Sequence, residues 1–242
     1  MFFRNVDPSR YTLYGHAKLN SPPGWINDIQ IPQRLPTQWG DISLVRATLL
    51  LYEAALKDSR NLYFILLSES CIPIISFSEL SSTLEQELSG GSKSFLAYRH
   101  IEDSKDRSSR YGKLSARIRT RLPWSDFYSQ HQWMILNRRH VEAIIQHECT
   151  ADFARVHAVD EHYAVTCLHL LGYLHKECIS HKTTYCDWGD KKASHPRHFD
   201  KITPSIVRLA RKRGCFFLRK VTPNCVYSEF LVRCVLSLRN RK

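Results

Sequence analysis

Short apolar runs alternate along the chain with stretches in which apolar residues recur every three or four positions. Residues 61–68 (NLYFILLS) are apolar almost throughout and have polar neighbours, which predicts a central buried strand. Helical spacing begins after Asp41 and predicts a helix that ends near Lys57, with Asp41 or Ser43 as its cap. This alternation is typical of an α/β fold in which helices cover a largely parallel sheet.

The same two patterns predict the other elements. No internal repeat or long linker divides residues 1–242, so we expect a single domain. The polar, Arg-rich residues 100–121 show neither pattern and predict a mobile loop over the site. The remaining expected strands lie at residues 10–17, 94–98, 132–136, 183–188 and 215–218, and the remaining expected helices at residues 77–88, 138–147, 160–171 and 203–214.

The chain carries an excess of positive charge. Lys and Arg number 35 against 23 Asp and Glu, which gives a formal net charge of +12. Such a surface attracts anions, whether nucleic acid, phosphorylated small molecules, acidic glycans or an anionic membrane. For any one basic cluster, the alternative to a binding site is a surface that faces only solvent. No zinc-finger, RRM or helix-turn-helix signature is present, so we expect no nucleic-acid partner.

The sequence carries neither a pattern for a membrane span nor one for export. No run of about 18 uncharged apolar residues occurs, and Arg4 and Asp7 stand where a secretory signal is apolar. We therefore expect a cytoplasmic location for the chain as given, with its eight cysteines mostly reduced. The Cys and His residues between positions 167 and 186 fit no common zinc spacing, so we expect no metal, with a structural zinc as the alternative.

The residues that follow the expected strand at 61–68 are candidates for ligand contact. In open α/β sheets, ligands bind in the crevice outside the carboxyl ends of the strands. Glu69 and Ser70 occupy that position, so we expect them to lie at a cleft.

Six groups of residues point to a known family when they are taken in order. They are residues 39–43 (WGDIS), 64–73 (FILLSESCIP), 132–133 (QW) with 137–140 (NRRH), 160–163 (DEHY), 187–188 (DW) with 195–196 (HP), and 215–220 (CFFLRK). Together they resemble the core-2/I-branching N-acetylglucosaminyltransferase family (glycosyltransferase family 14), especially its plant-type members. The collinear matches cover most of residues 11–225.

The resemblance implies a GT-A type glycosyltransferase fold, with a Rossmann-like mixed sheet flanked by helices. It also implies an inverting, metal-independent transfer of a sugar, GlcNAc or a related one, from a UDP-sugar donor to a glycan hydroxyl. Inversion needs one general base on the acceptor hydroxyl, and Glu161 in the DEHY group matches the family's base. Asp160 beside it is expected to cap the helix that begins there, and a merely structural role for Glu161 in that first turn is the alternative.

The diphosphate of the departing UDP needs positive charge, which many GT-A enzymes supply through a metal on an Asp-x-Asp motif. No Asp-x-Asp occurs in this chain, so no metal cofactor is expected, and fixed cations are the substitute. Lys220 matches the family's diphosphate lysine, with Arg219 beside it. As the second basic position we prefer Lys201 to Arg197.

The resemblance also assigns the acceptor contacts. Tyr185, Asp187 and Trp188 fall where the family places its acceptor aromatics, and Gln132 and Trp133 are expected to line the same cleft. Aromatic residues at strand spacing are equally typical of a protein core.

Two departures from the family pattern leave alternatives open. The chain starts at what reads as the family's second strand, so the first strand of the fold is expected to be missing, and the family's acidic residue is not found in residues 14–17 (YGHA). Family members are usually Golgi membrane proteins, and the anchor is not part of this sequence. A catalytically inactive glycan-binding or nucleotide-binding remnant of the fold is therefore the second hypothesis, and a basic nucleic-acid-binding protein is the third.

Overall fold

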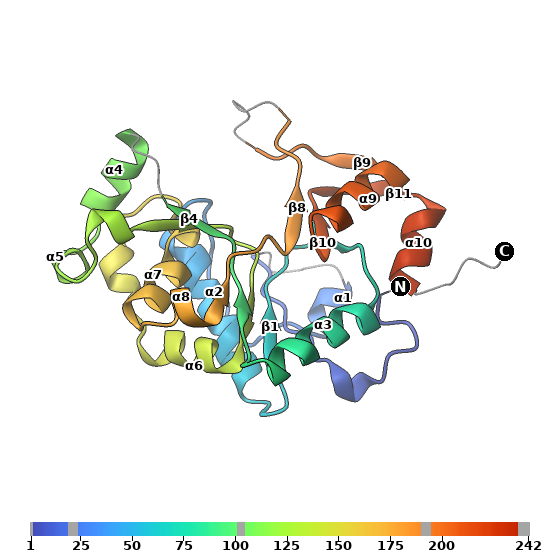
Figure 1. The fold of residues 1–242 in the computed structure, drawn as a ribbon, viewed down its shortest axis with the longest axis horizontal. Coiled ribbons are helices and arrows are strands. Elements are labelled where there is room, and N and C mark those ends of the chain that lie inside the picture. The colour runs from blue at the N-terminus through green and yellow to red at the C-terminus, as the bar shows by residue number, and fades with distance from the viewer. Residues whose placement is uncertain (1, 19–23, 101–104, 190–194, 237–242) are drawn as a thin grey trace.

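The computed structural model describes residues 2–18, 24–100, 105–189 and 195–236 of the chain. Its elements form two lobes, which lie side by side in Figure 1. The larger lobe is built mainly from residues 42–179 and the smaller lobe mainly from residues 184–236. None of the helices in the described part of the chain combines the length and the apolar character that crossing a bilayer requires.

The larger lobe contains a four-stranded mixed sheet. Its strands are, in spatial order, β1 (Tyr63–Ile65), β6 (Ile135–Asn137), β3 (Ser94–Phe95) and β7 (Cys178–Ile179). The first two pairings are antiparallel and only β3 and β7 run parallel, so the expectation of a largely parallel sheet is wrong, whereas the expected mixed α/β architecture is confirmed.

The strand expected to be central is an edge strand of this sheet. Within the described residues β1 pairs only with β6. Phe64 is buried and its ring meets Tyr52 edge-on at 6.0 Å, but Leu62 and Leu67 at the two ends of the apolar run are exposed. The run therefore buries only one face, against the helical layer. A continuous apolar sequence does not by itself determine how many strands a strand pairs with.

Helices α2 (Ile42–Leu56), α6 (Arg138–Gln146) and α7 (Tyr163–Leu170) pack around the core of this lobe. The predicted start of α2 is confirmed, since the Asp41 carboxylate accepts the backbone N–H of Ser43 at 2.8 Å. Helix α6 likewise begins where its sequence pattern predicts. The short helix α8 (Leu174–Glu177) leads into β7.

Residues 100–121 do not form the expected loop. They contain α4 (Lys105–Gly112) and α5 (Ala116–Arg119), while residues 101–104 lie outside the described part. Leu114 and Ile118 are each 2% exposed and belong to the main core. Leu114, Ile118 and Leu122 recur every four residues, which is the spacing of an apolar face of a helix. The many arginines around them obscure this pattern in the sequence.

The smaller lobe is built on a three-stranded sheet in the order β2 (Ile72–Pro73), β10 (Phe217–Arg219) and β8 (Thr184–Cys186). Strands β10 and β8 run parallel, with Arg219 opposite Cys186. The strand expected at 215–218 corresponds to β10, and a further strand, β11 (Val221–Tyr227), follows it and pairs in parallel with β9 (Phe199–Ile202).

Two helices complete the smaller lobe, α9 (Pro204–Lys212) and α10 (Glu229–Leu236). Thr203 caps α9 as predicted, with its hydroxyl accepting the N–H of Ile206 at 3.4 Å. The core of this lobe is separate from the main core.

The N-terminal strand expected at residues 10–17 is absent from the described residues, where Gly15 forms only an isolated bridge to Gln30. Helix α3 (Phe77–Ser89) is confirmed, with Ser76 as its cap. The other described elements are α1 (Gly24–Asn27), the antiparallel pair β4 (Tyr98–His100) and β5 (Tyr128–Gln130), and the 3-10 turns η1 (Pro8–Arg10), η2 (Trp124–Asp126), η3 (Thr150–Phe153) and η4 (Val159–Glu161).

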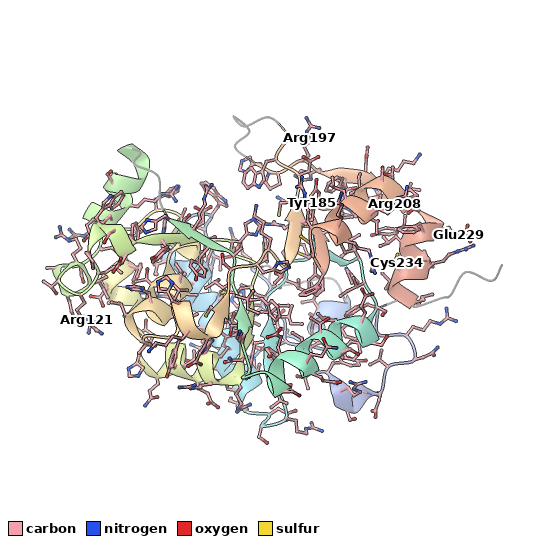
Figure 2. All side chains as sticks on the ribbon, viewed as in Figure 1. Arg121, Tyr185, Arg197, Arg208, Glu229 and Cys234 are labelled. Atoms are coloured by element: carbon pink, nitrogen blue, oxygen red, sulfur yellow. The ribbon has the colours of Figure 1, made fainter. Side chains whose placement is uncertain are left out.

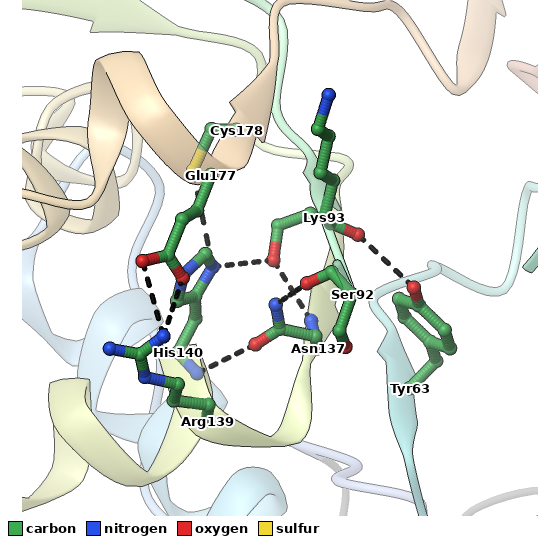
Figure 3. A network of polar contacts seen from close by, with 9 residues as sticks. Tyr63, Ser92, Lys93, Asn137, Arg139, His140, Glu177 and Cys178 are labelled. Carbon is green, nitrogen blue, oxygen red and sulfur yellow. Dashed lines mark hydrogen bonds and ion pairs between the residues drawn. The ribbon is translucent and has the colours of Figure 1, made fainter. Parts of the chain in front are cut away.

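The NRRH group forms a structural network rather than an open site (Figure 3). His140 is fully buried; its Nδ1 contacts the Ser94 hydroxyl at 2.7 Å and its Nε2 contacts the Glu177 carboxylate at 3.2 Å. The Asn137 side chain accepts the N–H of His140 at 2.8 Å and donates to the carbonyl of Ser92. These contacts join β3, β6, α6 and α8, so this matched group holds the sheet to its helices.

All eight cysteines are free thiols, and Cys149 Sγ and Cys167 Sγ lie 3.7 Å apart.

Candidate active site

Glu161 closes the turn η4, immediately before α7. Its Oε2 forms an ion pair with Arg110 Nη1 of α4 at 2.9 Å. The Glu161 side chain is 45% exposed, whereas that of Arg110 is 15% exposed. The carboxylate is therefore held from one side by a largely buried cation and remains accessible to a ligand from the solvent.

His162 supports this ion pair through a contact with Arg110. Its buried ring stacks on Phe127 at 4.6 Å and its Nδ1 lies 2.9 Å from the carbonyl oxygen of Tyr128. Because a carbonyl only accepts, Nδ1 must donate that hydrogen bond, which leaves Nε2 to accept from Arg110 at 3.3 Å. The ring thus fixes the cation that holds Glu161.

Asp160 does not cap a helix, so the expected capping role is wrong. No side chain caps η4 or α7, because His162 rather than Asp160 stands at the start of α7. Asp160 instead lines a small cavity of about 20 Å³ together with Gln132, room for about one water molecule. Burial, and then the nearby charge of Glu161, raise the pKa of Asp160 to about 6.

The first turn of α7 is held by Gln130 at the end of β5. The Gln130 amide donates to the carbonyl of Asp160 at 3.0 Å and accepts the N–H of Val165 at 2.5 Å. The buried Gln130 side chain therefore pairs with a backbone N–H that has no partner within the first turn of the helix, and it fixes the turn that carries Glu161.

The WGDIS group supports the same turn from another direction. The N–H of Ala158 donates to the carbonyl of Gly40 at 2.8 Å. Gly40 has a φ of +72°, and a Cβ there would lie 2.5 Å from the His157 ring, so this position requires glycine. The Trp39 ring packs edge-on against His157 at 5.2 Å and against His195 at 6.0 Å, and the second contact brings two of the matched groups together.

The basic CFFLRK group meets the loop after β1. The N–H of Val221, next to Lys220, donates to the carbonyl of Ser70 at 2.9 Å. Ser70 is buried and its hydroxyl lies 3.0 Å from that of Ser68, while Glu69 is exposed. This backbone bond brings Ser70 next to the end of the CFFLRK group, and a place for Glu69 and Ser70 at a cleft stays a prediction.

Arg219 and Trp133 form a stacked pair. The Arg219 guanidinium lies over the Trp133 ring at 4.2 Å, and the ring is only 6% exposed. In this arrangement Trp133 supports a cation, and its role as an acceptor contact stays a prediction.

Residues 130–133 connect the carboxylate to the cations, and we call them the bridging segment. At one end Gln130 holds the turn with Asp160 and Glu161, and at the other end Trp133 holds Arg219. Four residues span at most about 14 Å even when extended. The Glu161 turn and the Arg219–Lys220 strand end therefore flank one short stretch of chain.

The two candidates for the second diphosphate cation occupy different places. Lys201 is exposed on β9 opposite Val226 of β11, well beyond Lys220 along that strand. Arg197 precedes β9, and Phe199, two residues later, donates its N–H to the carbonyl of Lys220 at 2.8 Å. The backbone thus brings Arg197 close to Lys220 and separates Lys201 from the bridging segment.

The expected acceptor residues lie on and after β8. Tyr185 is buried under the guanidinium of Arg213, 5.4 Å from the ring centre. Asp187 accepts the N–H of Gly189 on Oδ1 at 2.9 Å, and its carbonyl accepts the N–H of Arg197 at 2.7 Å. Trp188 is 44% exposed and presents an open aromatic surface.

His131 in the bridging segment gives the site a pH-dependent stability. Burial, and then the charges of Lys182 and Arg219, lower the pKa of His131 to about 4. An unfolded histidine titrates near 6.5, so between about pH 6.5 and 4 the unfolded chain binds more protons and the free energy of unfolding falls by roughly 3 kcal/mol as the pH drops.

Comparing the protein with the His131→Gln variant isolates this effect, because the opposite titration of Asp160 is common to both. Chemical denaturation at a series of pH values should give a steeper loss of stability below pH 6.5 for the parent protein than for the variant. Parallel curves would contradict the buried, neutral state of His131.

Sequence reasoning missed Arg110, Gln130 and His131. Arg110 lies in the stretch expected to be a loop, and nothing in its local pattern marks it. Gln130 and His131 directly precede the matched QW group, so extending that group by two residues would have found them. Among the described residues, no three His, Cys, Asp or Glu side chains gather as a metal site would require.

Comparisons with known proteins agree with the matched groups. A family model described as Core-2/I-Branching enzyme matches residues 4–210. Glycosyltransferase BC10 of Oryza sativa subsp. japonica is 26% identical over 154 residues, which make up 61% of this chain. The matched stretch spans 36% of the length of that rice protein.

Proposed function

The chain belongs to the core-2/I-branching enzyme family, and we propose that it is a glycosyltransferase that moves a sugar from a UDP-sugar donor to a glycan hydroxyl. The donor sugar in this proposal is GlcNAc, the fold is of the GT-A type, and the reaction inverts the anomeric centre without a metal ion. The glycosyltransferase name of the rice relative supports the general activity.

The observation that carries the proposal is the bridging segment. A carboxylate that is accessible and ion-paired lies at one of its ends, and the Arg219 guanidinium, with Lys220 next to it in sequence, lies at the other. Direct displacement at an anomeric carbon needs this pair of features, a base for the attacking hydroxyl and positive charge for the leaving diphosphate.

In the proposed mechanism Glu161 takes the proton from the acceptor hydroxyl as its oxygen attacks the anomeric carbon. The C–O bond to the diphosphate breaks on the opposite face, and UDP leaves with the bonding electrons. Arg110 forms an ion pair with Glu161 and orients one of its oxygens. The proton passes from Glu161 to water after the product leaves.

Lys220 and Arg219 neutralise the charge that develops on UDP in this mechanism. Stacking on Trp133 limits the motion of the Arg219 guanidinium, so the charge is oriented before the substrate arrives. Fixed cations of this kind, with no Asp-x-Asp motif in the chain, are the basis for proposing a metal-independent reaction.

For the second diphosphate cation the geometry favours Arg197 over our initial choice, Lys201. The N–H of Arg197 donates to the carbonyl of Asp187 at 2.7 Å. Phe199, two residues after Arg197, donates its N–H to the carbonyl of Lys220. Lys201 lies on the part of β9 that pairs with the far end of β11.

Calorimetric titration with UDP, in the presence and absence of EDTA, tests the donor site. We expect binding with the same affinity in both buffers, because protein cations rather than a metal hold the diphosphate. Binding that disappears in EDTA and returns with manganese would overturn metal independence. No binding in either buffer would overturn the donor site and favour the inactive remnant, whereas strong salt-dependent binding of DNA instead would favour the nucleic-acid hypothesis.

A further inference from the structure

A second pocket, with a volume of about 330 Å³, opens beside β8. It is lined by Tyr185, by Lys182 and Ser180 from the segment before β8, by Arg213 after α9, and by His131 of the bridging segment. Figure 2 labels Tyr185 on β8, at the edge of the smaller lobe that faces the larger lobe. The volume is at the lower end of the usual range for small-molecule pockets and suits a single sugar ring.

The charge of this pocket is one-sided. Among the described residues its lining includes Lys182 and Arg213 but no Asp or Glu, and Arg219 lies just beyond Cys186, its partner in the sheet register. Burial, and then the charge of Asp187, raise the pKa of the Tyr185 phenol, and Asp187 Oδ1 already accepts the Gly189 N–H.

Some surface arginines of the protein have carboxylate partners among the described residues, and others do not. Arg138 pairs with Glu142, Arg139 with Glu177 and Arg211 with Glu79. Within the described residues, neither Lys182 nor Arg213 pairs with a carboxylate; Arg213 contacts only the face of Tyr185.

Among the lining atoms, His131 Nδ1 is buried and has no hydrogen-bond partner among the described residues. Buried polar atoms are nearly always hydrogen-bonded, so this ring nitrogen beside two cations favours a ligand that accepts hydrogen bonds. A merely solvated basic face would not need buried groups of this kind. His131 stays neutral at physiological pH because burial and the charges of Lys182 and Arg219 lower its pKa to about 4, so its ring nitrogen can donate to an anion without adding charge.

We propose that this pocket is an acceptor subsite that binds the anionic group of an acidic sugar, a uronate carboxylate or a sulfate ester, between Lys182 and Arg213. The inference deepens the proposed function and rests on it, because it takes the sugar that receives the transfer, or its neighbour in the glycan, to be acidic. The pocket adjoins the donor cations through β8 and β10 but uses different residues. Acidic glycans are thereby distinguished from neutral ones before transfer.

The test compares methyl β-glucuronide with methyl β-glucoside, which differ only in the carboxylate, by NMR titration of the full chain. Methyl glucoside 6-sulfate and inorganic sulfate form two further arms. We expect either acidic glycoside to bind at least about tenfold more tightly than the neutral one, the usual value of one charge-assisted hydrogen bond. The acidic glycoside that binds more tightly identifies the natural group as carboxylate or sulfate.

Lys182→Gln and Arg213→Gln should each weaken this binding by about tenfold, with the affinity for UDP unchanged. Lys212→Gln, an exposed cation one residue before Arg213, is the matched control and should have no effect. Two separate variants keep the test valid if one of them is poorly folded, which thermal unfolding would show.

Equal binding of the acidic and neutral glycosides, or no binding of either at about 10 mM, would overturn the inference, as would inorganic sulfate binding as tightly as the acidic glycoside. A loss of UDP affinity in Lys182→Gln and Arg213→Gln would also overturn it, because the pocket would then belong to the donor. Acid selectivity in a protein that does not bind UDP would support the pocket and contradict the glycosyltransferase.

Discussion

Replacing Glu161 with glutamine should lower the rate of sugar transfer by about 10²-fold to 10⁴-fold, the usual contribution of a general base. Glutamine keeps the shape of the side chain and can still accept a hydrogen bond from Arg110, which lies 2.9 Å from Glu161 Oε2. It does not take a proton from the acceptor hydroxyl. The affinity for UDP should barely change, since the carboxylate acts on the acceptor, and transfer rates together with calorimetry measure both quantities.

Asp160→Asn is the matched control for this variant. Because burial and Glu161 raise the pKa of Asp160 to about 6, its ionised form costs stability above that pH, and the cost is absent below the ordinary value of 3.8. The variant should therefore be more stable than the parent at pH 8, by up to about 3 kcal/mol, with turnover reduced less than in Glu161→Gln. Equal turnover of Glu161→Gln and the parent would remove Glu161 as the base, and a larger loss in Asp160→Asn would transfer that role to Asp160.

Lys220→Ala should slow transfer by about 10²-fold to 10³-fold and weaken UDP binding, as expected when one preorganised charge is lost from the leaving-group site. The backbone of Lys220 is held by the N–H of Phe199 and by the neighbouring bond from Val221 to Ser70, so the substitution leaves the local chain in place. Single-turnover rates and UDP titration measure the two effects.

Arg197→Gln and Lys201→Gln form the comparison for Lys220. The backbone position of Arg197 close to Lys220 predicts that its loss weakens UDP binding, whereas loss of Lys201 on the outer part of β9 should have little effect. The reverse result would restore the initial choice of Lys201. Unchanged UDP affinity in Lys220→Ala would exclude this lysine from the diphosphate site.

Three helix starts were predicted well from the sequence because their causes are local. Asp41, Ser76 and Thr203 each accept a backbone N–H two or three residues later, so the cap and the helix are encoded in adjacent positions. Strand order is a long-range property. Nothing in residues 61–68 specifies that β6, some seventy residues later, is the only described partner of β1.

The sequence predicts the candidate site residues that lie in the matched groups. It does not reveal those that join the site only through tertiary contacts. The DEHY and CFFLRK groups lead directly to Glu161 and Lys220, whereas Arg110 reaches Glu161 from 51 positions away along the chain. Some matched groups proved structural: Gly40 is required for close packing, and His140 is part of a buried network.

The central claim is that this chain transfers a sugar through Glu161, and product formation tests it most directly. The parent protein and Glu161→Gln are incubated with UDP-GlcNAc and a glycan array in EDTA, and the product linkage is read by NMR. We expect a β-linked product, inverted from the α-linked donor, from the parent protein and almost none from the variant. A parent protein that binds UDP but forms no product, or a product with retained configuration, would contradict inverting transfer through Glu161.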